Sequence, residues 1–407
     1  MLRRLPTSRL LALVAGVIAA LGGGTAIAMA ALGGGSGPKP PAKSLAAALH
    51  DAAAAVPTVQ GVTARISFTN HLIDSSSLPG GSNPLLSGAS GRLWAASDGR
   101  IRLELQSDSG DAQVTTDGKV LSVFDGTSNT VYRITLPQQD SSTQTKPDAA
   151  AGDKAPTIAV IQRFLDQLGQ HADVSGATPS DVAGHAAYTT RISPKHDGGL
   201  IGAAELAWDA ATGVPLRAAV YAAGNPNPVL ELKATDISFG PVDSSNLDVA
   251  PPAGAKVTKV DLSGGAQKHA DGAAGTPDKK VTDPKQIAAD LPFTLSAPDT
   301  LVGLPRQEIR PVDLDGEKGA LVTYGAGLGG IAVLEQAGSA TPAPPPTTDG
   351  HHHDHQLSLP RISIDGASGQ ELATALGTLV RFERSGVQYT LVGSVPPAAA
   401  EAAARGL

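Results

Sequence analysis

Residues 91–137 read GRLWAASDGRIRLELQSDSGDAQVTTDGKVLSVFDGTSNTVYRITLP, and this stretch decides the fold class. Ile101, Leu103 and Leu105 are separated by charged residues, and this period of two predicts a strand with one apolar face. The pairs Asp98-Gly99 and Asp117-Gly118 favour tight hairpin turns. The stretch therefore predicts an antiparallel meander in which one face of the sheet is lined with apolar side chains.

Similar patterns flank the meander on both sides. Before it, Ser44 can cap a helix over 45–56, and apolar residues alternate from Val62 to Phe68. After it, Pro156 can open a helix, because proline is tolerated in the first turn. The apolar residues of that helix recur at helical spacing, at Ile158, Ile161, Phe164, Leu165 and Leu168. Further strands are predicted over 185–192, 203–208, 215–221 and 229–239.

The second half of the chain predicts a separate domain. Residues 259–285 carry few apolar side chains and are interpreted as a linker between the domains. In the first half of the chain, residues 72–87 are rich in Ser, Gly and Pro and are predicted to form a loop. A smaller α+β domain is predicted over 286–407, with a His-rich insertion at 338–356. Its expected strands are 293–301, 308–314, 320–324, 331–336, 361–365, 378–383 and 388–392, and its helix is 397–405.

The first 32 residues form an export signal or an anchor. Arg3, Arg4 and Arg9 precede an uncharged apolar run from Leu10 to Leu32, which is the secretory order. The run approaches the roughly 20 residues that span a bilayer, so a cleaved signal peptide and a retained membrane anchor are both open. In either case the bulk of the chain is expected outside the cytoplasmic membrane, anchored or secreted. Residues 33–43, rich in Gly and Pro, are expected to act as a linker.

Composition excludes several classes of function. The formal charge of −7 argues against nucleic acid as a partner, because phosphates need a basic surface. The chain has no cysteine, so neither disulfides nor lipid attachment to a thiol is possible. Stability must come from a core of Val, Leu, Ile and Ala, since aromatic residues make up only 3%.

The order of these motifs resembles the LolA family of periplasmic lipoprotein carriers. The resemblance begins with GRLWAASDGRIRLEL and the DGK hairpin, and it continues through residues 204–257, which contain DAATGVP and end in PPAGAKV. It covers about residues 44–258, and the two-domain layout resembles that of RseB. Ser97-Asp98 stands where Gram-negative carriers usually show Arg-Pro, which departs from the pattern.

The resemblance implies an α+β fold in which a curved antiparallel half-barrel holds helices in its concavity. It also implies a non-catalytic role in binding a lipid or lipoprotein acyl chain, as carrier or acceptor, at the cytoplasmic membrane. The alternative is an envelope sensor or regulatory module of the RseB type that contacts an envelope protein partner. The candidates for lining the ligand cavity are apolar residues of the meander and of the helix after it: Leu103, Leu105, Val123, Phe124, Ile134, Ile161, Phe164 and Leu165.

Two further motifs contain residues of the kinds that bind metals or nucleotides. His351, His352, His353 and His355 could chelate zinc, nickel or copper, but a solvated polar insertion is the alternative. The glycines of 325–330 match a dinucleotide fingerprint as a string, yet a strand follows them where a helix is required, so a hairpin loop is expected. No nucleophile elbow, zinc-protease motif or phosphate loop is present, so neither an enzyme nor a cofactor is predicted.

Overall fold

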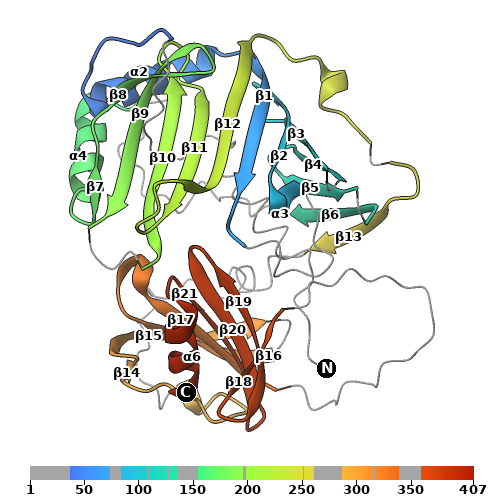
Figure 1. The fold of residues 1–407 in the computed structure, drawn as a ribbon, viewed down its shortest axis with the longest axis vertical. Coiled ribbons are helices and arrows are strands. Elements are labelled where there is room, and N and C mark those ends of the chain that lie inside the picture. Colours follow the sequence, from blue (N-terminus) through green and yellow to red (C-terminus); the bar gives the residue numbers. More distant parts are fainter. Residues whose placement is uncertain are drawn as a thin grey trace, which may run out of the picture.

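The computed structural model describes residues 37–73, 84–108, 110–126, 128–135, 155–195, 199–250, 252–260, 287–314, 317–338 and 359–407. Two sheets organise them into an N-terminal domain and a smaller C-terminal domain (Figure 1). The predicted signal or anchor over 1–32 and the His-rich residues 351–355 lie outside the described residues. Among the residues described, no helix has the length and apolarity needed to cross a membrane.

The N-terminal domain is built on a 13-stranded sheet. The strands are β1 (Gly61–Asn70), β2 (Ala89–Ala96), β3 (Ile101–Ser107), β4 (Gly110–Thr116), β5 (Val120–Asp125), β6 (Thr130–Thr135), β7 (Ala172–Val174), β8 (Thr178–Val182), β9 (His185–Pro194), β10 (Ile201–Asp209), β11 (Pro215–Ala222), β12 (Pro228–Phe239) and β13 (Lys256–Val260). Their order is β13-β6-β5-β4-β3-β2-β1-β12-β11-β10-β9-β7, with β8 also paired to β9. All neighbours are antiparallel except β13, which runs parallel to β6 and was not predicted.

The sheet is curved, as the half-barrel prediction requires. Figure 1 shows β2 to β6 turned away from the upright strands β9 to β12. The predicted hairpins join the meander, because Gly99 and Gly118 hold the positive φ values of 89° and 82° that glycine adopts at little cost. Asp117 fixes its turn by accepting hydrogen bonds at Oδ1 from the backbone N–H groups of Lys119 and Val120.

One face of the sheet is continuously apolar. The cross-strand register places side chains opposite one another from β1 to β6, and successive residues alternate between faces. One row across these strands runs Ala64, Leu93, Leu103, Val114, Val123 and Tyr132. Most of these side chains belong to a single buried cluster with Ile66, Leu121 and Ile134. The alternation predicted from the sequence is therefore confirmed on this face.

Three helices pack against the same face. The helices α2 (Leu45–Ala55) and α4 (Ile158–Leu168) form a buried cluster with Tyr188 and Trp208, which lie opposite each other on β9 and β10. Ser44 caps α2, because its Oγ accepts a hydrogen bond from the N–H of Ala47. The helix α4 begins two residues later than Pro156 suggests, with Thr157 as its N-cap.

The third helix was missed by the loop prediction for 72–87. The helix α3 (Pro84–Ser87) is four residues long, and its Leu85 is completely buried in the cluster of the curved sheet. The amide of Asn70 donates to the carbonyl of Leu85 over 2.7 Å. Tertiary packing thus fixes a helix that is too short to be stable by itself.

The C-terminal domain is built on an eight-stranded sheet in the order β14-β15-β16-β17-β21-β20-β19-β18. The elements are β14 (Thr300–Leu301), β15 (Leu304–Leu314), β16 (Glu317–Tyr324), β17 (Ile331–Ala337), β18 (Arg361–Ile364), β19 (Ala367–Thr374), β20 (Gly377–Arg384), β21 (Val387–Gly393) and the helix α6 (Pro397–Arg405). Ala400, Ala403 and Ala404 of α6 are fully buried in the core of this domain. The strand predicted over 293–301 is wrong except for Thr300–Leu301, and β19 was not predicted.

The two domains touch along a narrow joint. The N–H of Ala375 donates to the carbonyl of Leu72 over 2.9 Å, and the N–H of Leu200 donates to the carbonyl of Ser394 over 3.0 Å. A small apolar cluster spans the joint and contains Ile73, Leu86, Leu359 and Leu372.

Candidate functional site

The predicted cavity residues separate into three groups. Leu103, Leu105, Val123 and Ile134 lie together in the buried cluster on the apolar face of the curved sheet. Ile161 and Leu165 belong to the other buried cluster, between α4 and the end of the sheet.

The last two predicted residues lie apart from both clusters. Phe124 is in register with Gln113 and Val131, and it therefore lies on the opposite face from Val123. Phe164 is on the surface of α4, with 42% of its side chain exposed. The structure therefore brings six of the eight predicted residues into cores and leaves Phe124 and Phe164 outside them.

The apolar face of the curved sheet holds a small cavity. It is lined by Leu103 together with Ile66, Val114 and Leu216, and its volume is about 130 Å³. Sites for drug-sized ligands measure roughly 300–1,000 Å³, and an engineered cavity of about 150 Å³ holds benzene. The cavity is therefore smaller than the sites that hold drug-sized ligands.

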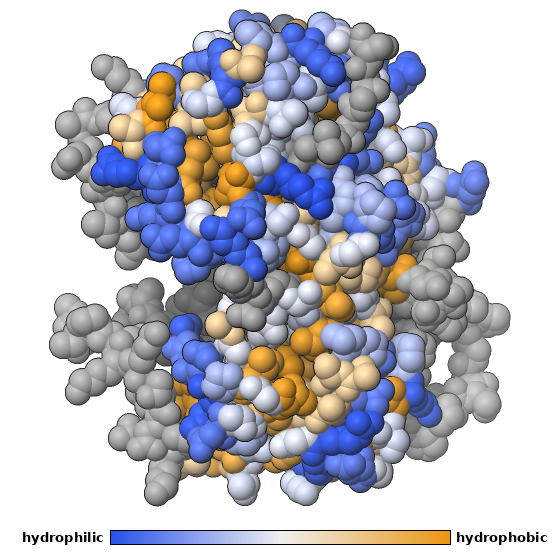
Figure 2. Space-filling view, turned by 60° about the vertical axis from the view of Figure 1, so that its left-hand side comes forward, coloured by the Kyte–Doolittle hydropathy of each residue, from blue (hydrophilic) through white to orange (hydrophobic). Residues whose placement is uncertain are grey.

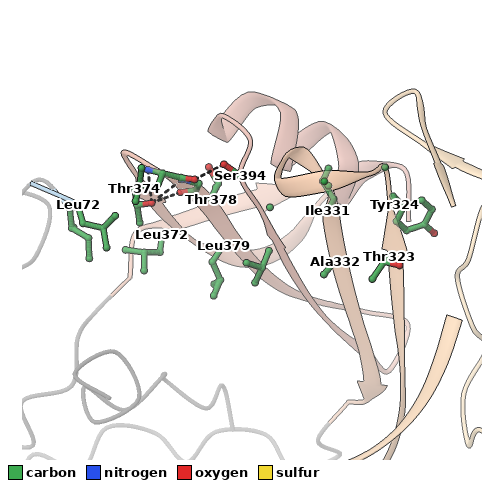
Figure 3. A pocket seen from close by; sticks show the side chains of 18 of the residues that line it. Leu72, Thr323, Tyr324, Ile331, Ala332, Leu372, Thr374, Thr378, Leu379 and Ser394 are labelled. Carbon is green, nitrogen blue, oxygen red and sulfur yellow. Dashed lines mark hydrogen bonds between the residues drawn. The ribbon is translucent and has the colours of Figure 1, made fainter. Parts of the chain in front are cut away.

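A larger apolar groove lies at the joint between the domains. Its volume is about 690 Å³, and it is walled on one side by Leu72, Ile73 and Leu230 of the N-terminal domain. The other wall is the face of the C-terminal sheet that points away from α6. Register places one row of side chains along this wall, namely Leu372, Leu379, Val392, Ala332 and Thr323 (Figure 3).

Three hydroxyl groups at the groove's edge are engaged within the C-terminal domain. The Oγ1 of Thr374 donates to the carbonyl of Gly377, and that of Thr378 donates to the carbonyl of Val395 over 2.8 Å. The Oγ of Ser394 donates to the carbonyl of Leu376 over 2.7 Å (Figure 3). Because these donors are used to shape the edge, the groove offers a ligand mainly apolar contact.

The described lining of the groove has few titratable groups. Among the described residues that line it, Tyr324 is the one with a titratable side chain, and burial raises its pKa well above the ordinary value. The glycines 325, 327 and 330 line its edge from the hairpin between β16 and β17, as expected for a loop and not for a dinucleotide site.

A buried carboxyl group lies in the same sheet. The side chain of Glu335 on β17 is completely buried, and burial raises its pKa to about 7. Its Oε2 accepts a hydrogen bond from the N–H of Ser296 over 2.8 Å, whereas Oε1 has no partner among the described residues. Along β17, Glu335 lies on the same face as Val333, whereas Leu334 and Ala332 lie on the opposite face. Its side chain therefore belongs to the core face and not to the groove.

An ionic cluster occupies the outer face of the curved sheet. The carboxylate of Glu205 is fully buried and is held by Arg191, Arg217 and the hydroxyl of Tyr221. Arg217 also binds Glu231 over 2.6 Å, so the charges are matched and serve to hold β9 to β12 together. Within the described part of the chain, no group of three His, Cys, Asp or Glu side chains could hold a metal ion.

The sequence did not predict the groove. Its wall depends on β19, whose sequence ASGQELAT has few apolar residues, and on the docking of two domains. One signal for the groove was present in the sequence. Leu379 and Val392 are apolar residues on the face of the sheet that does not pack against α6, so an apolar surface on that face could have been predicted.

No protein-family profile matches this sequence, and no curated protein matches it. Among solved structures, MucB in complex with MucA(peri) is similar, with 16% identity and a TM-score of 0.41, covering 88% of this chain and 97% of that one. The MucA/MucB complex of Pseudomonas aeruginosa is similar at 18% identity and a TM-score of 0.41, with 88% and 96% covered. A LolA superfamily protein from Nitrosomonas europaea is 10% identical with a TM-score of 0.20, over 51% of this chain and 99% of that one.

These similarities concern the fold alone. Their identities are too low for any residue to be matched between the chains.

Proposed function

We propose that this protein binds an apolar chain, such as a lipid or the acyl chain of a lipoprotein, outside the cytoplasmic membrane and without catalysing a reaction. The observation that carries this proposal is the interdomain groove, with its volume of about 690 Å³ and its row of apolar side chains. Val392, in the middle of that row, is 49% exposed. Burial of such side chains by a ligand is favourable, at roughly 25 cal/mol per Å² of apolar surface removed from water.

We place the ligand in the groove and not on the curved sheet. The cavity beside Leu103 measures about 130 Å³, below the range of ligand sites. The volume of the groove lies within that range.

Titration with a fluorescent fatty acid tests this placement. We expect saturable binding to the protein, and at least a tenfold loss of affinity in Val392→Asp, because a carboxylate must then be desolvated against the ligand. Val257→Asp is the matched control, since Val257 on β13 is also 49% exposed but lies away from the groove. Equal affinity in the two variants would place the ligand elsewhere.

A second candidate function is a regulatory module that responds to its ligand. It is favoured by the position of the groove across a joint that is held by backbone hydrogen bonds at Leu72 and Ser394. A ligand that fills such a joint can change the angle between the domains. Since the chain has no native cysteine, spin labels at Lys119→Cys and Leu328→Cys would report the interdomain distance. A distance distribution that fatty acid leaves unchanged would exclude this function.

A further inference from the structure

The helix α4 has more apolar surface than its own domain buries. Ile161 and Leu165, four residues apart, share the side that packs on the sheet. Val160 and Phe164, also four apart, share the neighbouring side and are 40% and 42% exposed. Ile158 in the first turn is 47% exposed, but at 3.6 residues per turn it lies on the other side of the buried pair. The helix therefore presents one side with two half-exposed apolar side chains, Val160 and Phe164, to the outside.

The polar side of α4 completes an amphipathic helix. Gln162 donates to Asp166 over 2.9 Å, and the guanidinium of Arg163 lies against its own helix. In Figure 2, which brings the α4 side of Figure 1 forward, hydrophobic residues gather on the upper domain within a hydrophilic border. The side with Val160 and Phe164 lies between this polar side and the buried side, where it can enter the interface of a bilayer.

The start of the described chain is fixed close to this helix. The hydroxyl of Tyr188 donates to the carbonyl of Pro41 over 2.6 Å, and Pro40 is buried. Tyr188 belongs to the same cluster as Ile161 and Leu165. The Nδ1 of His50 lies 2.9 Å from the carbonyl of Pro156, just before α4. The expected linker is thus held at Pro40 and Pro41 on the end of the sheet that carries α4.

The docked start leaves little chain between the domain and the apolar segment. The segment expected to enter the membrane ends at Leu32, and the chain is held on the domain from Pro40. Eight residue steps reach at most about 28 Å when fully extended. A retained segment would therefore hold this end of the sheet close to the lipid headgroups.

We propose that Val160 and Phe164 of α4 dock onto the surface of the lipid bilayer in which the N-terminal segment is held. The surface is small, so free protein in solution would bind weakly, but the short connection makes docking intramolecular and raises the effective concentration of lipid. The inference rests on the proposed extracytoplasmic location with the segment retained, and it does not require that the groove hold a ligand.

Quenching by brominated lipid tests the docking. The full chain, with its N-terminal segment, is reconstituted into phosphatidylcholine vesicles with or without bromine on the acyl chains. The variant Phe164→Trp carries the probe, and Leu328→Trp is the control, because Leu328 is 57% exposed on the C-terminal domain. The native Trp94 and Trp208 are buried, and the unsubstituted protein supplies their baseline.

We expect brominated lipid to reduce the added emission of Phe164→Trp at least twofold and to leave that of Leu328→Trp unchanged. Unchanged emission from Phe164→Trp would overturn the proposal, as would equal quenching of both variants, which would indicate unspecific contact. Neither result would bear on fatty-acid binding, so failure here is distinguishable from failure of the proposed function.

Discussion

Replacement of Glu335 by glutamine should stabilise the C-terminal domain, and only at neutral and alkaline pH. The carboxyl group is completely buried and has a pKa raised from 4.5 to about 7 by burial. The folded protein therefore holds the proton more tightly than the unfolded chain between these two values. The free energy of unfolding is therefore highest below pH 4.5, the pKa of this carboxyl group in the unfolded chain. It falls as the pH rises from there to about 7, the pKa of the group in the folded protein, and then stays low.

The size of the effect follows from the two pKa values. Their difference corresponds to about 3 kcal/mol, at roughly 1.4 kcal/mol for each unit of pKa. Glu335→Gln removes the charge and keeps an oxygen to accept from Ser296, so the variant avoids this cost. We expect it to exceed the unsubstituted protein by about 3 kcal/mol at pH 8 and by under about 1 kcal/mol at pH 5.

Differential scanning calorimetry at both pH values measures this. A gain of about 3 kcal/mol should raise the midpoint of the C-terminal domain by about 10 °C at pH 8. The control Asp299→Asn removes an exposed carboxylate that pairs with Arg306 over 2.8 Å, and it should change stability by less than about 1 kcal/mol at either pH. The reasoning is refuted if Glu335→Gln is equally stabilising at pH 5 and pH 8, or destabilising at pH 8.

Three further predictions concern the N-terminal domain. Leu103→Ala opens a cavity beneath a residue that is 1% exposed and should cost 2–5 kcal/mol in urea denaturation, roughly the range for buried leucines; a cost under 1 kcal/mol would show a loosely packed sheet. Arg217→Met leaves the buried Glu205 with one cationic partner and should cost roughly 3–5 kcal/mol at pH 7, whereas a neutral effect would mean that the ionic cluster is dispensable. Tyr188→Phe removes the hydrogen bond to Pro41 and should cost about 1 kcal/mol, with faster hydrogen exchange at residues 42–46; unchanged exchange would show that the chain start is not held there.

Much of the N-terminal sheet could be predicted because its local signals agree. The Asp-Gly pairs at residues 98–99 and 117–118 set the hairpins, and the alternation around Leu103 sets the buried face. Each of these signals lies within a few residues of the structure that it determines. The prediction therefore needed no knowledge of distant contacts.

The missed elements depend on contacts between distant residues. The strand β19 has weakly apolar residues and is ordered by pairing with β18 and β20 on its two sides. Gly369 of β19 lies so close to β20 that a Cβ atom added to it would be 3.1 Å from the carbonyl oxygen of Arg381. The helix α3 likewise depends on Leu85 reaching a core made by other strands. The periodicity of a segment cannot predict contacts that it makes with residues far away in the sequence.

The apolar face of the meander could be predicted from the sequence, whereas the groove could not. The resemblance to the LolA family implied an apolar ligand beside the meander, where most of the predicted residues fill the core and the cavity measures about 130 Å³. The groove arises where Leu72 and Leu230 of one domain meet the outer face of the other. That meeting depends on how two independently folded surfaces dock, which a reading of each segment by itself does not reveal.

Organic extraction of the purified protein, followed by mass spectrometry, tests the central claim most directly. The protein is isolated from its own envelope, and the extracted lipid is counted against the protein. We predict close to one acyl-bearing molecule per chain in the unsubstituted protein and in Val257→Asp, and a loss of most of it in Val392→Asp. Lipid absent from the unsubstituted protein, or retained in full by Val392→Asp, would contradict the assignment of the interdomain groove as a binding site for apolar chains.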